Sequence, residues 1–239
     1  MKMNVFVWMT AGLVGLGSMS MSQGAVVYTG GTLIQDFTGY DGTAGPTGWD
    51  ADGFSSGAGF SENRGPSSGG EGTGGTYAFD IGSGNIALGV QPGGSDFTPG
   101  FYELVVDNQT GAEISQWNVA FESYFFNDED RGNSFDFSYS TNGVDYTNVV
   151  SAGFTSPELA ATNPTWEVGA VYSDVILASV PSGSNLYLRW TGDDVSGGGS
   201  RDEFALDNVS VSAVPEPTTA GLLAVGFAGI SIMRRRRKS

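Results

Sequence analysis

Residues 134–143 read Ser-Phe-Asp-Phe-Ser-Tyr-Ser-Thr-Asn-Gly. Aromatic side chains alternate with small polar ones over Phe135–Tyr139, which is the period of a half-buried β-strand. The Asn142-Gly143 pair supplies the positive-φ positions of a tight hairpin turn. The stretch therefore predicts an antiparallel hairpin that joins Phe135–Tyr139 to Val144–Val150.

Segments with the same period recur along the middle of the chain, and no long amphipathic helical pattern interrupts them. Ile114–Phe126 reads as one long strand or two in series, and Asn185–Thr191 directs its apolar side chains to one face. The other strand candidates are Thr32–Phe37, Tyr77–Ile81, Ile86–Val90, Phe101–Val106, Val171–Ala178 and Glu203–Val211. Repeated strands without helices predict an all-β fold, an antiparallel β-sandwich with jelly-roll-like topology.

Two local features modify this prediction. Within Glu203–Val211 the apolar residues change parity at Asp207-Asn208, which predicts a β-bulge. Residues 39–75 are rich in glycine and lack the alternation, so we expect a long loop region with one strand near Ala58–Phe60. Loops of this length are often functional or disordered.

The chain contains neither cysteine nor histidine. Disulfides, zinc–thiolate sites and cysteine nucleophiles are therefore excluded, and so are the catalytic triads and zinc sites that require histidine. Glycoside hydrolysis needs only a pair of carboxylates, but no strand carries a catalytic carboxylate pattern. We expect the domain not to be an enzyme, with a glycan-active enzyme as the alternative.

Acidic residues dominate the middle of the chain. All Asp and Glu residues except Glu216 lie between residues 25 and 213, together with only four arginines. Such a surface keeps a domain soluble and repels nucleic acid and anionic lipid, so we expect no nucleic-acid partner. We expect the arginines to make ion pairs within loops, for example Arg131 with Asp130 and Arg201 with Asp202.

The first 24 residues have the organisation of a secretory signal peptide. Lys2 gives a positive start, and apolar residues follow from Val5 to Leu16. Because Ser22 and Gly24 offer small residues at a cleavage site, we expect signal peptidase to cut after Gly24 once the Sec machinery has exported the chain. A retained membrane anchor is the alternative.

Residues 214–239 contain a short motif, an apolar run and a basic tail, in that order. The motif is Val214, Pro215, Glu216 and Pro217, the run extends from Ala220 to Met233, and the tail contains Arg234, Arg235, Arg236, Arg237 and Lys238. The run predicts a short transmembrane helix, and the positive-inside rule keeps the basic tail in the cytoplasm. The domain at residues 25–213 would then lie on the far side of the inner membrane.

This three-part tail resembles the PEP-CTERM sorting signal. The resemblance implies recognition by an exosortase, an integral-membrane cysteine peptidase, and cleavage at or near Val214–Pro217. It also implies an exported protein that is anchored transiently in the inner membrane and then resides in the cell envelope, at the outer surface or outside the cell. An unprocessed tail anchor is the alternative.

Acidic turns suggest calcium ligands, because calcium takes six to eight oxygen atoms and tolerates irregular loops. No EF-hand spacing is present. Residues 50–53 and 127–130 form two such turns. The candidate calcium ligands outside these turns are Asp193, Asp194, Asp202 and Asp207. Solvated turn acids are the alternative.

Sugar binding is a further hypothesis. Residues 202–211 resemble the last strand of secreted jelly-roll modules, some of which bind carbohydrate. The main candidates for stacking on sugar rings are Tyr40 and Trp49, and further aromatic residues are Trp166 and Tyr187. The sequence thus predicts a sorted, exported β-sandwich without catalytic activity, or else a carbohydrate- or calcium-dependent module that binds exopolysaccharide.

Overall fold

The computed structural model describes residues 24–215 of the 239-residue chain. The predicted transmembrane helix and basic tail lie outside the described residues, as do residues 1–23 of the predicted signal peptide and Glu216 and Pro217 of the motif. The described part contains one helical turn, η1 at Val150–Ala152, and no helix that is long and apolar enough to cross a membrane.

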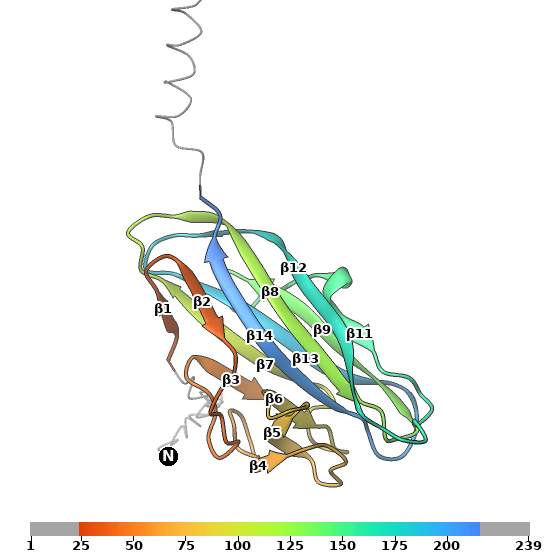
Figure 1. Cartoon of the computed structure of the whole chain (residues 1–239). Helices are drawn as coiled ribbons and strands as arrows, with labels where there is room; N and C mark the ends of the chain where they lie inside the picture. Colours follow the sequence, from red (N-terminus) through yellow and green to blue (C-terminus); the bar gives the residue numbers. More distant parts are fainter. Residues whose placement is uncertain (1–23, 216–239) are drawn as a thin grey trace, which may run out of the picture.

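Two β-sheets face one another in the described part (Figure 1). The strands of sheet A are β1 (Val26–Tyr28), β3 (Trp49–Asp52), β7 (Gly100–Asn108), β9 (Arg131–Ser140), β10 (Thr147–Asn148), β11 (Phe154–Thr155) and β13 (Asn185–Gly197). The strands of sheet B are β2 (Thr32–Gln35), β4 (Asn63–Ser67), β5 (Gly75–Asp80), β6 (Ile86–Gln91), β8 (Ile114–Phe126), β12 (Trp166–Val180) and β14 (Glu203–Ala213).

The strand orders are those of a sandwich. Sheet A runs β1-β7-β13-β9-β10, with β3 on β7 and β11 on β9, and sheet B runs β12-β8-β14-β6-β5-β4, with β2 on β14. Most neighbours are antiparallel, whereas the β1–β7 and β4–β5 pairs are parallel. The predicted antiparallel β-sandwich is confirmed.

The core between the sheets is mainly aromatic. Every second residue of β8 from Trp117 to Phe125 is buried, as the alternation predicts. The ring of Phe121 lies edge-on to the ring of Trp190 on β13, with centroids 5.1 Å apart, and Phe137 of β9 packs against both. Because each such ring buries about 150–250 Å², this layer joins sheet A to sheet B.

The predicted hairpin is present, but its turn is wider than predicted. Strand β9 pairs with β10 through Tyr139 and Thr147, so six or more residues separate the paired segments. Gly143 has a φ of 70°, whereas Asn142 keeps a negative φ and caps the loop instead. Its Oδ1 accepts hydrogen bonds from the N–H groups of Val144 and Asp145, each at 2.9 Å. A side-chain-capped loop therefore replaces the expected two-residue turn.

The predicted bulge in β14 is confirmed. The register against β8 shifts between Asp207 and Ser210, and Asn208 has a φ of 53°. Before the bulge β14 pairs with β6, and after it β14 pairs with β2. The bulge thus lets β14 pair with two different strands, β6 and β2, along the same edge.

The glycine-rich region is more ordered than expected. It contains β3 and β4, whereas the strand predicted near Ala58–Phe60 is absent and those residues lie in a turn. Strand β4 contains Gly65 and Pro66, which weaken any strand signal in the sequence. Pro66 is tolerated in this strand because β4 is the edge of sheet B and pairs only with β5.

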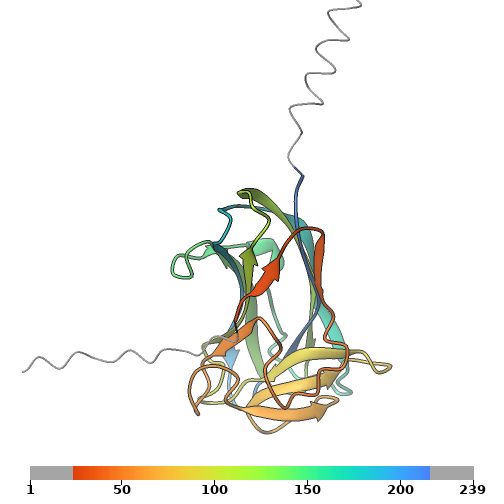
Figure 2. The same ribbon diagram turned by 90° about the vertical axis from the view of Figure 1, so that its left-hand side faces the viewer.

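The last described residues leave the sandwich at one end. The end of β14 lies beside the β1–β2 turn and the start of β8, and β3 to β6 lie toward the opposite end (Figure 2). The β7–β8 and β12–β13 turns also lie at the exit end, because Asn108 donates its side-chain N–H groups to the carbonyl oxygens of Ala112 and Val180.

Candidate functional site

The predicted sorting motif begins where the fold ends. Val214 donates its N–H to the carbonyl oxygen of Gln116 at 3.0 Å, and Ala213 donates its N–H to the hydroxyl of Tyr28 at 2.8 Å. The next residue, Pro215, is exposed. The last strand is therefore hydrogen-bonded up to the first residue of the motif, and no linker lies between them.

Glu203, at the start of β14, lies close to the half-buried carboxyl group of Asp128. Glu203 is 0 % exposed, and its Oε1 accepts the N–H of Glu71 at 2.5 Å. Burial, reinforced by the neighbouring Asp128 carboxylate, raises the pKa of Glu203 to about 9, and burial also raises the pKa of Asp128. With both groups ionised, Asp128 Oδ1 and Glu203 Oε2 would have no donor. The pair therefore keeps one proton at neutral pH, which the two carboxylates share.

Asp202 is the predicted calcium ligand that lies beside this pair. It is buried, its Oδ1 accepts the N–H of Glu129 at 3.1 Å, and burial raises its pKa to about 6. Asp207 lies further along β14, where its carboxylate accepts a hydrogen bond from Asn85 at 2.9 Å. Within residues 24–215, no three His, Cys, Asp or Glu side chains are grouped so that they could hold a metal ion. The structure thus does not bring the predicted calcium ligands together.

Asp193 and Asp194 lie at the end of sheet A, and Asp194 is engaged by two arginines. Its carboxylate contacts Arg131 at 2.5 Å and Arg201 at 2.6 Å, and Asn133 donates a further hydrogen bond at 2.8 Å. These donors lower the pKa of Asp194 against the opposing effect of its burial. The expected pairing of each arginine with its sequence neighbour is wrong, because both guanidinium groups converge on Asp194.

The two main candidates for sugar stacking are both packed into the protein. Trp49 is 0 % exposed, and its ring centroid lies 5.4 Å from that of Trp190 in the core. Tyr40 is half-buried, packs against Phe37, and has its pKa raised by burial. Trp49 therefore has no ring face open to a sugar, which corrects the prediction. The isolation of Trp49 in glycine-rich sequence hid the fact that it belongs to a strand.

An aromatic cluster on the outer face of sheet A is more accessible. The guanidinium carbon of Arg189 lies 3.8 Å from the ring centroid of Phe101 and 3.8 Å from that of Tyr146. Glu103 holds the cluster, because its Oε2 accepts hydrogen bonds from Arg189 Nε at 2.9 Å and from the Tyr146 hydroxyl. The rings of Phe101 and Tyr146 are partly exposed, and so is Tyr187 on the same strand as Arg189.

A shallow pocket adjoins this aromatic cluster. It has a volume of about 300 Å³ and is lined by Phe101 and Arg189 together with Asp52, Thr191 and the Gly53 and Pro99–Gly100 backbone. Ring faces beside carboxylate, hydroxyl and guanidinium groups are a combination that can recognise sugar hydroxyls. The sequence directed the apolar side chains of Asn185–Thr191 to one face, but the neighbours of Arg189 come from other strands and gave no local signal.

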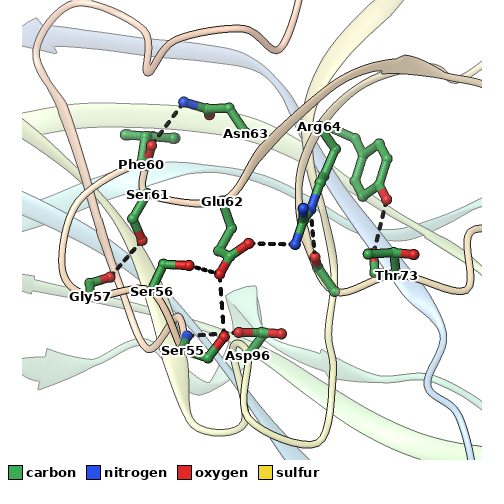
Figure 3. A network of polar contacts seen from close by, with 12 residues as sticks. Ser55, Ser56, Gly57, Phe60, Ser61, Glu62, Asn63, Arg64, Thr73 and Asp96 are labelled. Atoms are coloured by element: carbon green, nitrogen blue, oxygen red, sulfur yellow. Dashed lines mark hydrogen bonds and ion pairs between the residues drawn. The ribbon is translucent and has the colours of Figure 1, made fainter.

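A buried carboxylate fixes the glycine-rich region. Glu62 is 8 % exposed and accepts hydrogen bonds from the hydroxyls of Ser55 and Ser56 while pairing with Arg64, as Figure 3 shows. Arg64 also donates to the carbonyl oxygen of Gly74 at 2.9 Å. These donors, with Ser56 the strongest, lower the pKa of Glu62. The network ties the loop at Ser55 and Ser56 to the start of β4.

Comparison with known protein families identifies the tail. Residues 213–238 match the PEP-CTERM protein-sorting motif. This match implies an exported protein that an exosortase processes at the membrane. It covers only the C-terminal segment, so it says nothing about what the sandwich does. No curated protein matches the chain.

Comparison with solved structures finds matches at low similarity. The K3 adhesin domain of Lys-gingipain from Porphyromonas gingivalis W83 is 12 % identical, with a TM-score of 0.45, over 76 % of this chain and 98 % of that one. The xylan-binding domain CBM22-1 of Xyn10C from Paenibacillus barcinonensis is 12 % identical, with a TM-score of 0.41, over 79 % and 98 %. The carbohydrate-binding module CBM28, specific for non-crystalline cellulose, is 11 % identical, with a TM-score of 0.41, over 78 % of this chain and 97 % of that one. No residue can be equated between these chains at such identities.

Proposed function

We propose that this protein is an exported surface or extracellular-matrix component whose sandwich is released by an exosortase acting at Val214–Pro217. The Sec machinery exports the chain, and signal peptidase removes residues 1–24. The apolar run and basic tail then hold the chain in the inner membrane until the exosortase cuts it. The sandwich then resides at the cell envelope or outside the cell and has no catalytic role.

The position of the motif is the observation that carries this proposal. Strand β14 is hydrogen-bonded as far as Val214, and Pro215 is exposed directly after it. A cut at the motif would leave the whole sandwich intact, because no strand extends beyond it in the described residues. The tail would be removed without disturbing the core.

Cell fractionation of a motif variant tests the proposal. Replacing Glu216 with Ala in the full chain should leave most of the protein in the membrane fraction, whereas the parent should be recovered outside it. Glu167→Ala on the exposed face of β12 is the matched control and should behave like the parent. Release of the Glu216→Ala protein at the parental level would contradict processing at this motif.

A second proposed function, binding of an uncharged polysaccharide, is favoured by the aromatic cluster on sheet A. Phe101 and Tyr146 present partly exposed rings beside a pocket that Asp52 and Thr191 line. The domain is strongly acidic, so long-range repulsion disfavours anionic polymers and leaves neutral exopolysaccharide as the ligand class.

Affinity electrophoresis in gels that contain a neutral β-glucan, xylan or galactan tests this second function. Tyr146→Ala should clearly weaken the retardation shown by the parent domain, because about 0.5–1.5 kcal/mol of stacking is lost with the ring. Tyr124→Ala is the matched control: Tyr124 is also partly exposed and also donates its hydroxyl proton to a glutamate, Glu122, but lies on sheet B. Equal retardation of the parent and Tyr146→Ala would reject this face as the site.

A further inference from the structure

The exit end of the sandwich carries a pocket directly beside the sorting motif. The pocket has a volume of about 630 Å³, and its lining includes the β1–β2 turn, the start of β8, the end of β14, and the motif residues Val214 and Pro215. Tyr28, Ile114 and Ala213 give it an apolar part, and Thr32 and Asn118 give it a polar rim.

The lining of the pocket is nearly free of charge, whereas the domain as a whole is strongly acidic. Among the residues that line the pocket, only Glu113 has a carboxylate side chain, and that carboxylate accepts a hydrogen bond from Ser179. The start of β14, at the other end of the same strand, carries Asp202 and Glu203 close to Asp128. The pocket would therefore accept an uncharged partner.

The pocket also stands on a rigid frame. Asn108 is fully buried, and its side chain donates to Ala112 and Val180 while accepting from Thr110. The hydroxyl of Tyr28 accepts from Ala213 and donates to the carbonyl oxygen of Gly31 at 2.8 Å. These hydrogen bonds fix the turns around the pocket and the end of β14 relative to each other, as a preformed docking surface requires.

The short spacing between the motif and the apolar run brings the processing enzyme close to the exit end of the sandwich. Only six residues lead from Val214 to the start of the apolar run at Ala220. Even fully extended, they span roughly 20 Å. A small protein domain is about 30 Å across. The part of an enzyme that holds the motif at the membrane surface therefore works close to the exit end of the sandwich, within reach of the pocket.

From this we propose that the exit-end pocket is a docking surface for the processing peptidase, which inserts an uncharged loop with an apolar side chain there. The inference rests on the proposed processing at Val214–Pro217 and adds to it. Peptidases commonly bind substrate as an extended strand, yet the residues before the motif are already paired in β14. Docking on the folded end lets the enzyme hold the substrate without unpairing that strand.

Processing kinetics in cells that contain the peptidase test the inference with the full chain. Asn118→Trp and Thr32→Trp fill the pocket without adding charge, and both positions are exposed. We expect each to slow the loss of the tail in a pulse–chase experiment by about tenfold, which corresponds to about 1.4 kcal/mol of lost binding. Ser173→Trp, exposed on β12 away from the pocket, should be processed at the parental rate.

A linker insertion separates docking from simple obstruction. About twelve Gly and Ser residues inserted between Ala213 and Val214 span roughly 20 Å as a random coil. With docking, the insertion should slow processing and remove the difference between Asn118→Trp and its parent. Faster processing after insertion, or pocket variants processed at the parental rate, would overturn the docking surface. A parent chain that is not processed at all would instead overturn the proposed function.

Discussion

At the scale of single residues, burial sets the protonation of the acids at the start of β14. Glu203 is fully buried beside Asp128, and neither carboxylate has an arginine partner among the described ion pairs. A buried charge without a partner is costly, so the folded state retains a proton that the unfolded chain would release. The stability of the domain should therefore depend on pH through this pair.

The sign of that dependence follows from the pKa of Glu203, which is 4.5 for an exposed glutamate and about 9 in the fold. Between these values the folded state binds more protons than the unfolded state, so the free energy of unfolding should fall as pH rises from about 5 to 9. Asp202, with a pKa raised to about 6, adds to the loss below pH 6. Urea unfolding of Glu203→Gln should show a flatter profile than the parent, and Glu167→Gln should not. A parental profile that rises from pH 5 to 9 would contradict the shared proton.

Trp49 gives a second prediction at this scale. Its ring is fully buried against Trp190 and Phe37, so Trp49→Ala should lower the free energy of unfolding by about 3–5 kcal/mol. Chemical unfolding followed by circular dichroism measures this. A loss below about 1 kcal/mol would mean that the ring is not packed in the core. Because the ring is inaccessible, the folded variant should still bind any glycan that the parent binds.

At the scale of elements, periodicity was a good guide wherever strands alternate. The alternation in β8, β9 and β13 and the parity change in β14 predicted those strands and the bulge. It failed for β3 and β4, because Asp50, Asp52 and Pro66 are poor strand formers that tertiary pairing overrides. The aromatic cluster on sheet A was invisible for a related reason: strand pairing between distant segments brings its members together.

Close packing of the glycine-rich region gives a prediction at this scale. Gly42 has a φ of 68°, and a Cβ there would lie 2.6 Å from the carbonyl oxygen of Gly65 and 2.8 Å from the nitrogen of Ala78. Gly39 has a φ of 81° with nothing within 4 Å, so Gly39→Ala should cost only the backbone strain of about 1–2 kcal/mol. Thermal unfolding should show a clearly larger loss for Gly42→Ala. Equal losses would mean that the loop does not pack on β4 and β5.

At the scale of the whole molecule, the sandwich directly adjoins the segment that matches the PEP-CTERM protein-sorting motif, residues 213–238. The hydrogen bonds of Ala213 and Val214 place the boundary at the sorting motif. The sequence alone was enough to recognise the tail, because its three parts are contiguous. The exit-end pocket could not be predicted, because its walls come from two separate turns, the start of β8 and the end of the last strand.

The most direct test of the account is the C-terminal residue of the protein recovered from its native host. Intact mass and C-terminal peptide mapping should be carried out separately on membrane, envelope and extracellular fractions. The account predicts a chain that begins near Ala25, ends within Val214–Pro217, and is found outside the inner membrane. A mature chain that still carries residues 220–239 in the membrane fraction would contradict it.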